Sequence, residues 1–114
     1  MPEVLVIGTP QGERLLRFET GAITLGRGLE NDVVLNTRFT SRVHARVVRS
    51  GGNLFYLEDC SRNGTFVVLR EAPPVLLRHG EQIPLMGYGL IGLGVVPRMN
   101  TPGTLRFSLV RSVL

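Results

Sequence analysis

The stretch Ser41-Arg42-Val43-His44-Ala45 places a hydroxyl, a guanidinium and an imidazole within four consecutive residues. A polar run, residues 36–40, precedes it, and an apolar-alternating run, Ala45 to Val48, follows it. This pattern predicts the end of a loop at the point where a β-strand begins. Binding residues concentrate on loops that a rigid scaffold positions. We therefore interpret this stretch as part of a binding site. The strand that follows it is one of a series of short apolar runs that lie on both sides of it in the sequence.

Short apolar runs recur along the whole chain and are separated by turn residues, including many of the 14 glycines and 7 prolines. No stretch shows a helical period of useful length, so the pattern predicts an all-β fold. The expected strands are residues 3–7, 14–18, 22–25, 32–35, 45–49, 54–58, 65–69, 75–77, 82–85 and 104–110. The glycine-rich residues 87–94 read either as a strand with bulges or as a loose apolar loop. About ten or eleven short strands with regular turns predict a sandwich or a barrel.

Turn chemistry supports this division into strands. Thr9-Pro10-Gln11-Gly12, Thr20-Gly21 and Ser50-Gly51-Gly52-Asn53 each predict a reversal of the chain. Asn63-Gly64 predicts the tip of a further loop, because this dipeptide tolerates a positive φ.

Length and composition limit the possible classes of protein. At 114 residues we expect one domain, residues 1–114, with enough buried surface to fold without a disulfide or a metal. The single cysteine, Cys60, cannot form an internal disulfide, which favours a reducing compartment and a cytoplasmic location. No apolar run approaches the roughly 20 residues that a membrane span needs, and residues 1–20 do not resemble a signal peptide. We therefore expect no direct membrane association.

All 13 basic residues are arginines, and the net charge is +4. The arginines are explained either by a bias in codon composition or by recognition of oxyanions, because the guanidinium fork matches carboxylate and phosphate geometry. Aromatic residues do not interleave with a basic cluster as they do in proteins that bind single-stranded nucleic acid.

With two histidines and one cysteine we expect no metal site, and Ser41 and His44 lack the acid and the glycine pattern of a hydrolase. We predict no catalytic residues and no cofactor.

Four motifs in order resemble the forkhead-associated (FHA) domain family. They are Ile23-Thr24-Leu25-Gly26-Arg27 with Asn31-Asp32-Val33-Val34-Leu35; Ser41-Arg42-Val43-His44-Ala45; Asp59, Ser61 and Asn63-Gly64-Thr65-Phe66-Val67; and Leu77, Gly80-Glu81 and Ile83. Each motif alone is weak, but their order and spacing on an all-β background are specific. The resemblance covers nearly the whole chain. It implies a twisted β-sandwich of about eleven mostly antiparallel strands, with functional loops at one end that bind phosphothreonine peptides, and no enzymatic activity.

The resemblance also implies roles for single residues. Arg27 resembles the arginine that grips the phosphate, Ser41 the serine whose hydroxyl donates to it, and Arg42 an adjacent residue that reaches it. Asn63 resembles the asparagine that bonds the ligand backbone, and Arg62 stands where the family often has a threonine or another small polar residue that contacts phosphate. The residues expected to support the site are Gly26, His44, Gly64 and Thr65.

The same residues suit the ligand on chemical grounds. A phosphothreonine carries about −1.5 to −2 charges and three acceptor oxygens. Arg27 can offer a fork, Ser41 a hydroxyl and a backbone N–H, and Arg42 a second cation. The expected partner is therefore a protein phosphorylated by a Ser/Thr kinase pathway, with no nucleic acid bound.

Two other functions remain open. The same fold could serve as a phospho-independent interaction or dimerisation domain, because residues 86–94 are unusually apolar for the family and could form an exposed patch. A β-barrel that binds oligonucleotides is less favoured, because two tyrosines, five phenylalanines and no tryptophan leave few residues for stacking. A second departure from the family is the stretch 68–74, which ends in two prolines and predicts a longer, stiffer turn than the usual Asn-Gly hairpin.

Overall fold

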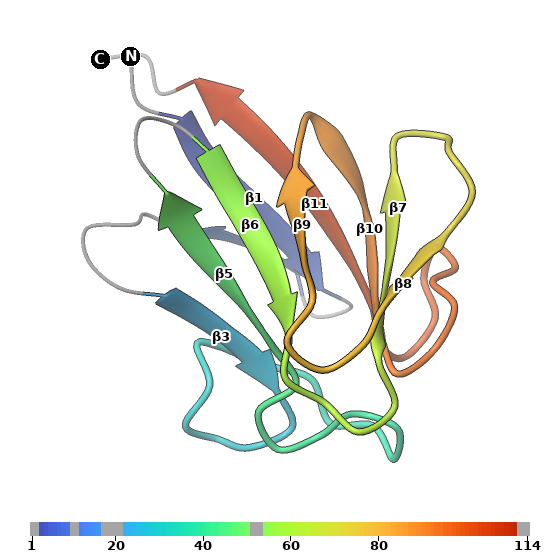
Figure 1. Ribbon diagram of the computed structural model, residues 1–114. Coiled ribbons are helices and arrows are strands. Elements are labelled where there is room, and N and C mark those ends of the chain that lie inside the picture. The colour runs from blue at the N-terminus through green and yellow to red at the C-terminus, as the bar shows by residue number, and fades with distance from the viewer. Residues whose placement is uncertain (1–2, 10–11, 17–21, 51–53, 112–114) are drawn as a thin grey trace.

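The computed structural model describes residues 3–9, 12–16, 22–50 and 54–111, which form eleven strands in two sheets. The six-stranded sheet has the order β2 (Gly12–Leu16), β1 (Glu3–Thr9), β11 (Thr104–Arg111), β10 (Tyr88–Leu93), β7 (Thr65–Leu69) and β8 (Val75–Leu77). The five-stranded sheet has the order β4 (Val33–Val34), β3 (Ala22–Gly26), β5 (Ala45–Ser50), β6 (Leu54–Asp59) and β9 (Gln82–Leu85). The two sheets face each other as a sandwich (Figure 1).

The predicted all-β sandwich is therefore confirmed. Every described pair of strands is antiparallel except β3 and β4, which run parallel. None of the described residues is helical, so this part of the chain holds no helix that could cross a membrane.

Most strands begin and end within two residues of their predicted bounds, and three differences need an explanation. β2 begins at Gly12, and its description ends at Leu16; the predicted residues 17–18, the turn at 20–21 and the turn tips at 10–11 and 51–53 lie outside the described residues. β4 contains only Val33 and Val34, because the Asp32 carboxylate accepts the Thr24 N–H at 2.8 Å and so replaces a strand bond. Residues 88–93 form a regular central strand rather than a loose loop, because β7 and β11 pair with both of its edges.

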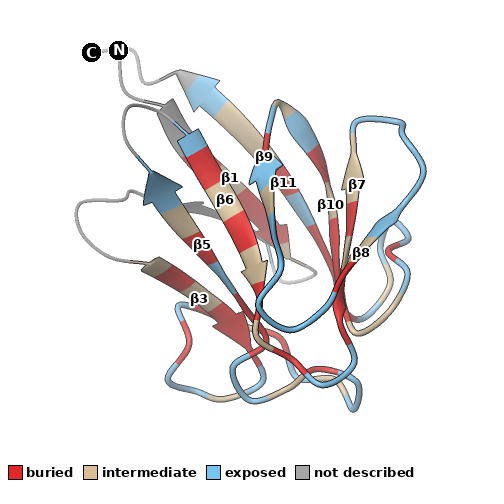
Figure 2. Ribbon diagram, in the orientation of Figure 1, coloured by how far each residue is buried: buried red, intermediate tan, exposed pale blue. Residues whose placement is uncertain are grey.

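The core lies between the sheets and follows the alternation of each strand. In β5 and β6 the inward residues Ala45, Val47, Phe55 and Leu57 are at most 1% exposed. Leu105 and Phe107 of β11 face them from the six-stranded sheet, and Figure 2 shows the buried residues along the facing strands. Each fully buried side chain of this size contributes roughly 1.5–3 kcal/mol. The core therefore provides the rigid scaffold on which the loops depend.

One end of the sandwich collects three connecting segments that are distant in sequence. They are the β3–β4 connection, residues 27–32; the β4–β5 connection, residues 35–44; and the β6–β7 connection, residues 60–64. Figure 1 shows them together at the lower end, whereas β1 begins and β11 ends at the upper end.

Candidate functional site

Backbone hydrogen bonds tie the first two connecting segments together. The N–H of Arg27 donates to the carbonyl of Ser41 at 2.9 Å, and the N–H of Gly28 donates to the carbonyl of Arg42 at 3.0 Å. Gly26 permits this approach, because a Cβ at that position would lie 2.4 Å from the Arg42 carbonyl oxygen. The fixed backbone lowers the ordering cost of a ligand that touches both segments.

A hollow of about 260 Å³ lies where the three segments meet. Its lining residues come from all three segments and are Arg27, Arg38, Phe39, Thr40, Ser41, Arg62 and Asn63. We call it the loop hollow. It brings together four of the five residues predicted to contact a phosphopeptide, namely Arg27, Ser41, Arg62 and Asn63. Among the described residues that line it, three are arginines and none is acidic, so the hollow suits an anion.

The polar groups of the loop hollow are already oriented by one another. The Ser41 hydroxyl oxygen accepts the Arg62 N–H at 3.3 Å, so the hydroxyl hydrogen is not used in that bond and can donate to a ligand. The Asn63 amide donates to the Phe39 carbonyl at 3.1 Å. The Ser41 N–H, expected above as a donor to phosphate, donates instead to the His44 Nδ1 at 2.9 Å. That expectation is wrong for this arrangement, because a backbone N–H supplies only one hydrogen.

His44 joins two of the connecting segments, residues 35–44 and residues 60–64, through hydrogen bonds of its ring. Its side chain is fully buried, its Nδ1 accepts the Ser41 N–H, and its Nε2 donates to the Gly64 carbonyl at 2.9 Å. These two bonds require the neutral ring with its hydrogen on Nε2. Burial lowers the pKa of His44, and the Gly64 carbonyl and the Asp59 charge oppose that shift. The neutral form that braces Ser41 is therefore the stable one.

A second polar cluster holds the β6–β7 connection. It is formed by Asp59, Ser61, Gly64 and Thr65 of the third motif, whose mutual hydrogen bonds the sequence does not specify. The buried Asp59 Oδ1 accepts the Ser61 hydroxyl at 2.6 Å and the Thr65 hydroxyl at 2.7 Å. The Ser61 oxygen in turn accepts the Gly64 N–H at 2.8 Å. Gly64 has φ +87°, as the Asn-Gly dipeptide predicted, and this conformation would strain other residues. The cluster fixes the backbone that carries Arg62 and Asn63.

Arg42 lies outside the loop hollow. Its Nε pairs with Glu30 Oε1 at 2.7 Å, and the backbone hydrogen bond at Glu30 together with Arg42 lowers the pKa of that carboxyl group. Arg42 lines a neighbouring hollow of about 390 Å³ with Leu29 and Glu30, and Arg27 lines both hollows. The phosphate contact suggested for Arg42 therefore has less support than those of the other four residues.

Arg38 is a residue that the sequence analysis missed. It lines the loop hollow, and its guanidinium carbon lies 4.9 Å from the centre of the Phe39 ring. Such a position over an aromatic ring favours a cation and fixes its plane. Its position three residues before Ser41, in the same loop, is the sequence feature that could have marked it as a candidate site residue. The polar run 36–40 predicts a loop and does not indicate where the Arg38 side chain lies.

A comparison with known families now identifies the architecture. The sequence profile of the FHA domain matches residues 23–86, which include all three connecting segments. The chain belongs to the FHA domain family. The predicted resemblance is confirmed, and the parts of this FHA domain that form the loop hollow all lie within the match.

Similar proteins agree with this assignment. The chain is 32% identical over 91 residues to the ABC transporter ATP-binding/permease protein Rv1747 of Mycobacterium tuberculosis (strain ATCC 25618 / H37Rv). That stretch is 80% of this chain and 10% of Rv1747, so the chain spans about a tenth of that relative.

Two solved structures share the fold over nearly their whole length. The crystal structure of Mycobacterium tuberculosis Rv1747 FHA-1 has a TM-score of 0.72 at 21% identity, covering 97% of this chain and 100% of that one. The N-terminal FHA domain of RAD53P from S. cerevisiae, in complex with a phosphothreonine peptide, has a TM-score of 0.69 at 21% identity, covering 93% and 91%. Identities this low establish the fold alone.

The described residues contain no group of three or more His, Cys, Asp or Glu side chains that could hold a metal ion. Burial and the charge of Glu58 raise the pKa of the Cys60 thiol, so the reactive thiolate is disfavoured. The chemistry offered at this end of the domain is that of anion binding.

Proposed function

We propose that this FHA domain binds phosphothreonine-containing segments of partner proteins in the loop hollow. One observation carries the proposal: Arg27, Arg38 and Arg62 share a hollow with the Ser41 hydroxyl, and no carboxylate is among the described residues that line it. The phosphothreonine peptide bound by the FHA domain of RAD53P supports the same choice of ligand. In this proposal Arg27 and Ser41 hold the phosphate, Arg62 and Arg38 add charge, and Asn63 bonds the peptide backbone.

The size of the expected affinity follows from the number of contacts. A charge-assisted hydrogen bond contributes about 1.5–3 kcal/mol net, and micromolar binding needs about 8 kcal/mol. Phosphate contacts from Arg27 and Ser41 alone would fall short. Contacts to the peptide backbone, such as that of Asn63, therefore belong to the proposal.

We further propose that the domain is a recognition module rather than an enzyme. It would act in the cytoplasm, where a Ser/Thr kinase can phosphorylate its partner. The lone half-buried cysteine fits a reducing compartment. The single-domain assignment of residues 1–114 stays a prediction.

Calorimetry with matched peptides tests the proposal. Peptides that carry phosphothreonine, phosphoserine or unmodified threonine at one position would be titrated into the domain. We expect binding of the phosphothreonine peptide only. Arg27→Ala should weaken it about 30-fold or more, because one charge-assisted fork is lost.

Arg78→Ala provides the matched control, because Arg78 is exposed and lies outside the loop hollow. It should leave the affinity within about twofold, since a distant exposed charge is screened by salt. Equal binding of the phosphorylated and unmodified peptides, or an unchanged affinity in Arg27→Ala, would contradict the proposal.

A further inference from the structure

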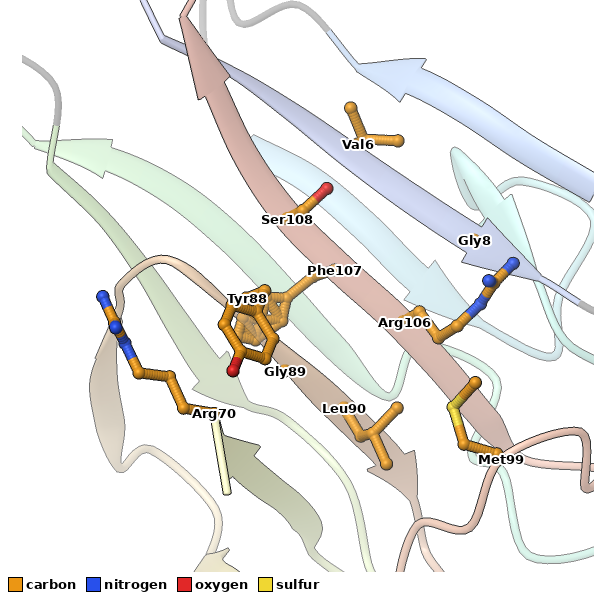
Figure 3. Close-up of a pocket in the computed structure, with 10 residues that line it drawn as sticks. All are labelled: Val6, Gly8, Arg70, Tyr88, Gly89, Leu90, Met99, Arg106, Phe107 and Ser108. Carbon is orange, nitrogen blue, oxygen red and sulfur yellow. The ribbon is translucent and has the colours of Figure 1, made fainter. Parts of the chain in front are cut away.

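A second hollow, of about 400 Å³, lies on the six-stranded sheet and shares no lining residue with the loop hollow. Its lining includes Val6, Arg70, Tyr88, Leu90, Met99 and Arg106 (Figure 3). We call it the sheet hollow. Its volume falls within the range of about 300–1,000 Å³ that is usual for ligand sites.

The strand register explains why these side chains meet. Val6 and Tyr88 both pair with Ser108, and Gly8 and Leu90 both pair with Arg106, so two rows cross three strands. Their neighbours Ile7, Phe107 and Ile91 are buried in the core, and successive side chains of a strand point to opposite faces. The two rows therefore face away from the core.

Gly8 determines where one cation lies. A Cβ at position 8 would lie 2.8 Å from the Arg106 Nη2, so the guanidinium rests on the bare backbone of β1. On the other side of the hollow, the Arg70 guanidinium carbon lies 5.8 Å from the centre of the Tyr88 ring. Figure 3 shows Arg70 and Arg106 on opposite sides of Tyr88 and Leu90.

The space between the two arginines is apolar and open. Tyr88 is 49% exposed and Met99 is 54% exposed, and Leu90 is partly exposed between them. Large exposed apolar side chains that adjoin one another are unusual on a monomer and mark interaction sites. Methionine also adapts its shape to different partners.

No carboxylate is among the described residues that line the sheet hollow. Elsewhere in the described chain Arg42 and Arg46 each pair with a glutamate. An acidic ligand would complement the charges of Arg70 and Arg106. A second copy of this chain is a poor candidate, because a two-fold pairing would set like patches on chains of net charge +4 against each other.

We propose that the sheet hollow binds an acidic segment of a partner protein, one that presents a single apolar side chain between carboxylates. The apolar side chain would pack on Tyr88 and Leu90, and the flanking carboxylates would pair with Arg70 and Arg106. Neither contact uses phosphate, so this docking is independent of phosphorylation. It adds a second interaction surface to the one proposed for the loops.

A peptide library of defined composition tests the proposal. Its members are unphosphorylated, carry one central Phe, Leu, Trp or Met, and have Glu, Lys or Gln on both sides. We expect fluorescence polarisation to show binding of the Glu-flanked members only. The double variant Arg70→Glu, Arg106→Glu should weaken the best member about tenfold or more and should favour Lys-flanked members. Tyr88→Ala should weaken it about fivefold through lost packing.

The controls keep the two surfaces apart. Both variants should bind a phosphothreonine peptide as the unchanged domain does, which also shows that they fold. If the double variant Arg70→Glu, Arg106→Glu does not fold, the double variant Arg70→Gln, Arg106→Gln takes its place. Equal binding of Glu- and Lys-flanked peptides, no binding of any member, or an unchanged affinity after charge reversal overturns the proposal. So does a dimer in sedimentation that Tyr88→Glu dissociates, because a second copy would then occupy the face. None of these results would alter the outcome for phosphothreonine.

Discussion

The loop hollow and the sheet hollow both present arginines, yet the two are constructed differently. The sheet hollow is bounded mainly by neighbouring strands, so the pleat and the register place its side chains. The loop hollow is bounded by three separate connections, which buried polar groups such as His44 and Asp59 hold in place. Changes beneath the loop hollow should therefore affect stability and binding together, whereas changes in the sheet hollow should affect binding alone.

The largest contrast is expected between His44→Ala and Tyr88→Ala. Loss of His44 leaves the Ser41 N–H without its acceptor, removes one of the two hydrogen bonds to the Gly64 carbonyl and opens a cavity, which should lower the free energy of unfolding by about 3 kcal/mol. Tyr88→Ala on the exposed sheet face should cost less than about 1 kcal/mol. Urea denaturation measures both values. His79→Ala, which removes an exposed histidine, is the control. Equal losses in the free energy of unfolding for His44→Ala and Tyr88→Ala would contradict the difference drawn between the loop hollow and the sheet hollow.

Asp59→Asn tests whether charge or shape holds the third connection. The amide keeps one acceptor but weakens the bonds from Ser61 and Thr65, and it places an NH₂ group where the buried Asp59 Oδ2 makes no hydrogen bond. We expect a loss of about 2 kcal/mol in the free energy of unfolding and a weaker phosphopeptide affinity. Calorimetry and thermal unfolding report the two effects. A stability loss without a change in affinity would show that this cluster does not position Arg62 and Asn63.

Acidic pH should lower the free energy of unfolding through the protonation of His44. Its pKa is lowered in the folded protein, so below the unfolded pKa of about 6.5 the unfolded chain binds more protons and stability falls. The fall should extend from about pH 6.5 down to the lowered pKa, with a slope of at most about 1.4 kcal/mol per pH unit, and should level off below it. His79→Gln leaves His44 as the one histidine, so its denaturation profile isolates the effect. A flat profile from pH 7 to 5 would contradict it.

The smallest expected effects on phosphopeptide affinity distinguish Arg38 from Arg42, the two arginines nearest to Ser41 in the sequence. Arg38→Ala should weaken phosphopeptide binding about fivefold, because Arg38 lines the loop hollow. Arg42→Ala should change it less than about twofold, because Arg42 pairs with Glu30 outside that hollow. Calorimetry at low salt resolves the two. The opposite order would restore the contact that the sequence suggested for Arg42.

The sequence predicted the strands well because their apolar alternation is local. Residues 45–49, 54–58 and 104–110 all became strands with that alternation toward the core. It also placed Arg27, Ser41, Arg62 and Asn63 together, since the motifs of the FHA family specify which loops meet. Residues 87–94 allow two interpretations, because glycines at 87, 89, 92 and 94 fit a loose apolar loop as well as a strand with bulges.

What the sequence could not provide is the direction of long or buried polar side chains. Arg38 and Arg42 have the same chemistry four residues apart, yet Arg38 lines the loop hollow whereas Arg42 pairs with Glu30 outside it. The third motif marks Asp59, Ser61 and Thr65, but an aspartate at the end of a strand gives no sign of which hydroxyls it will accept. Such choices depend on tertiary neighbours rather than on local pattern.

β1 starts and β11 finishes at the end of the sandwich remote from the three connections (Figure 1), where Glu3 lies opposite Arg111 in the strand register. An attachment to either terminus would therefore leave the loop hollow open to solvent. A fluorophore, a surface anchor or a neighbouring polypeptide could be fused there without obstructing a docked peptide. The architecture thus suits a reader that works while tethered, with its ligand-facing rim turned away from the point of attachment.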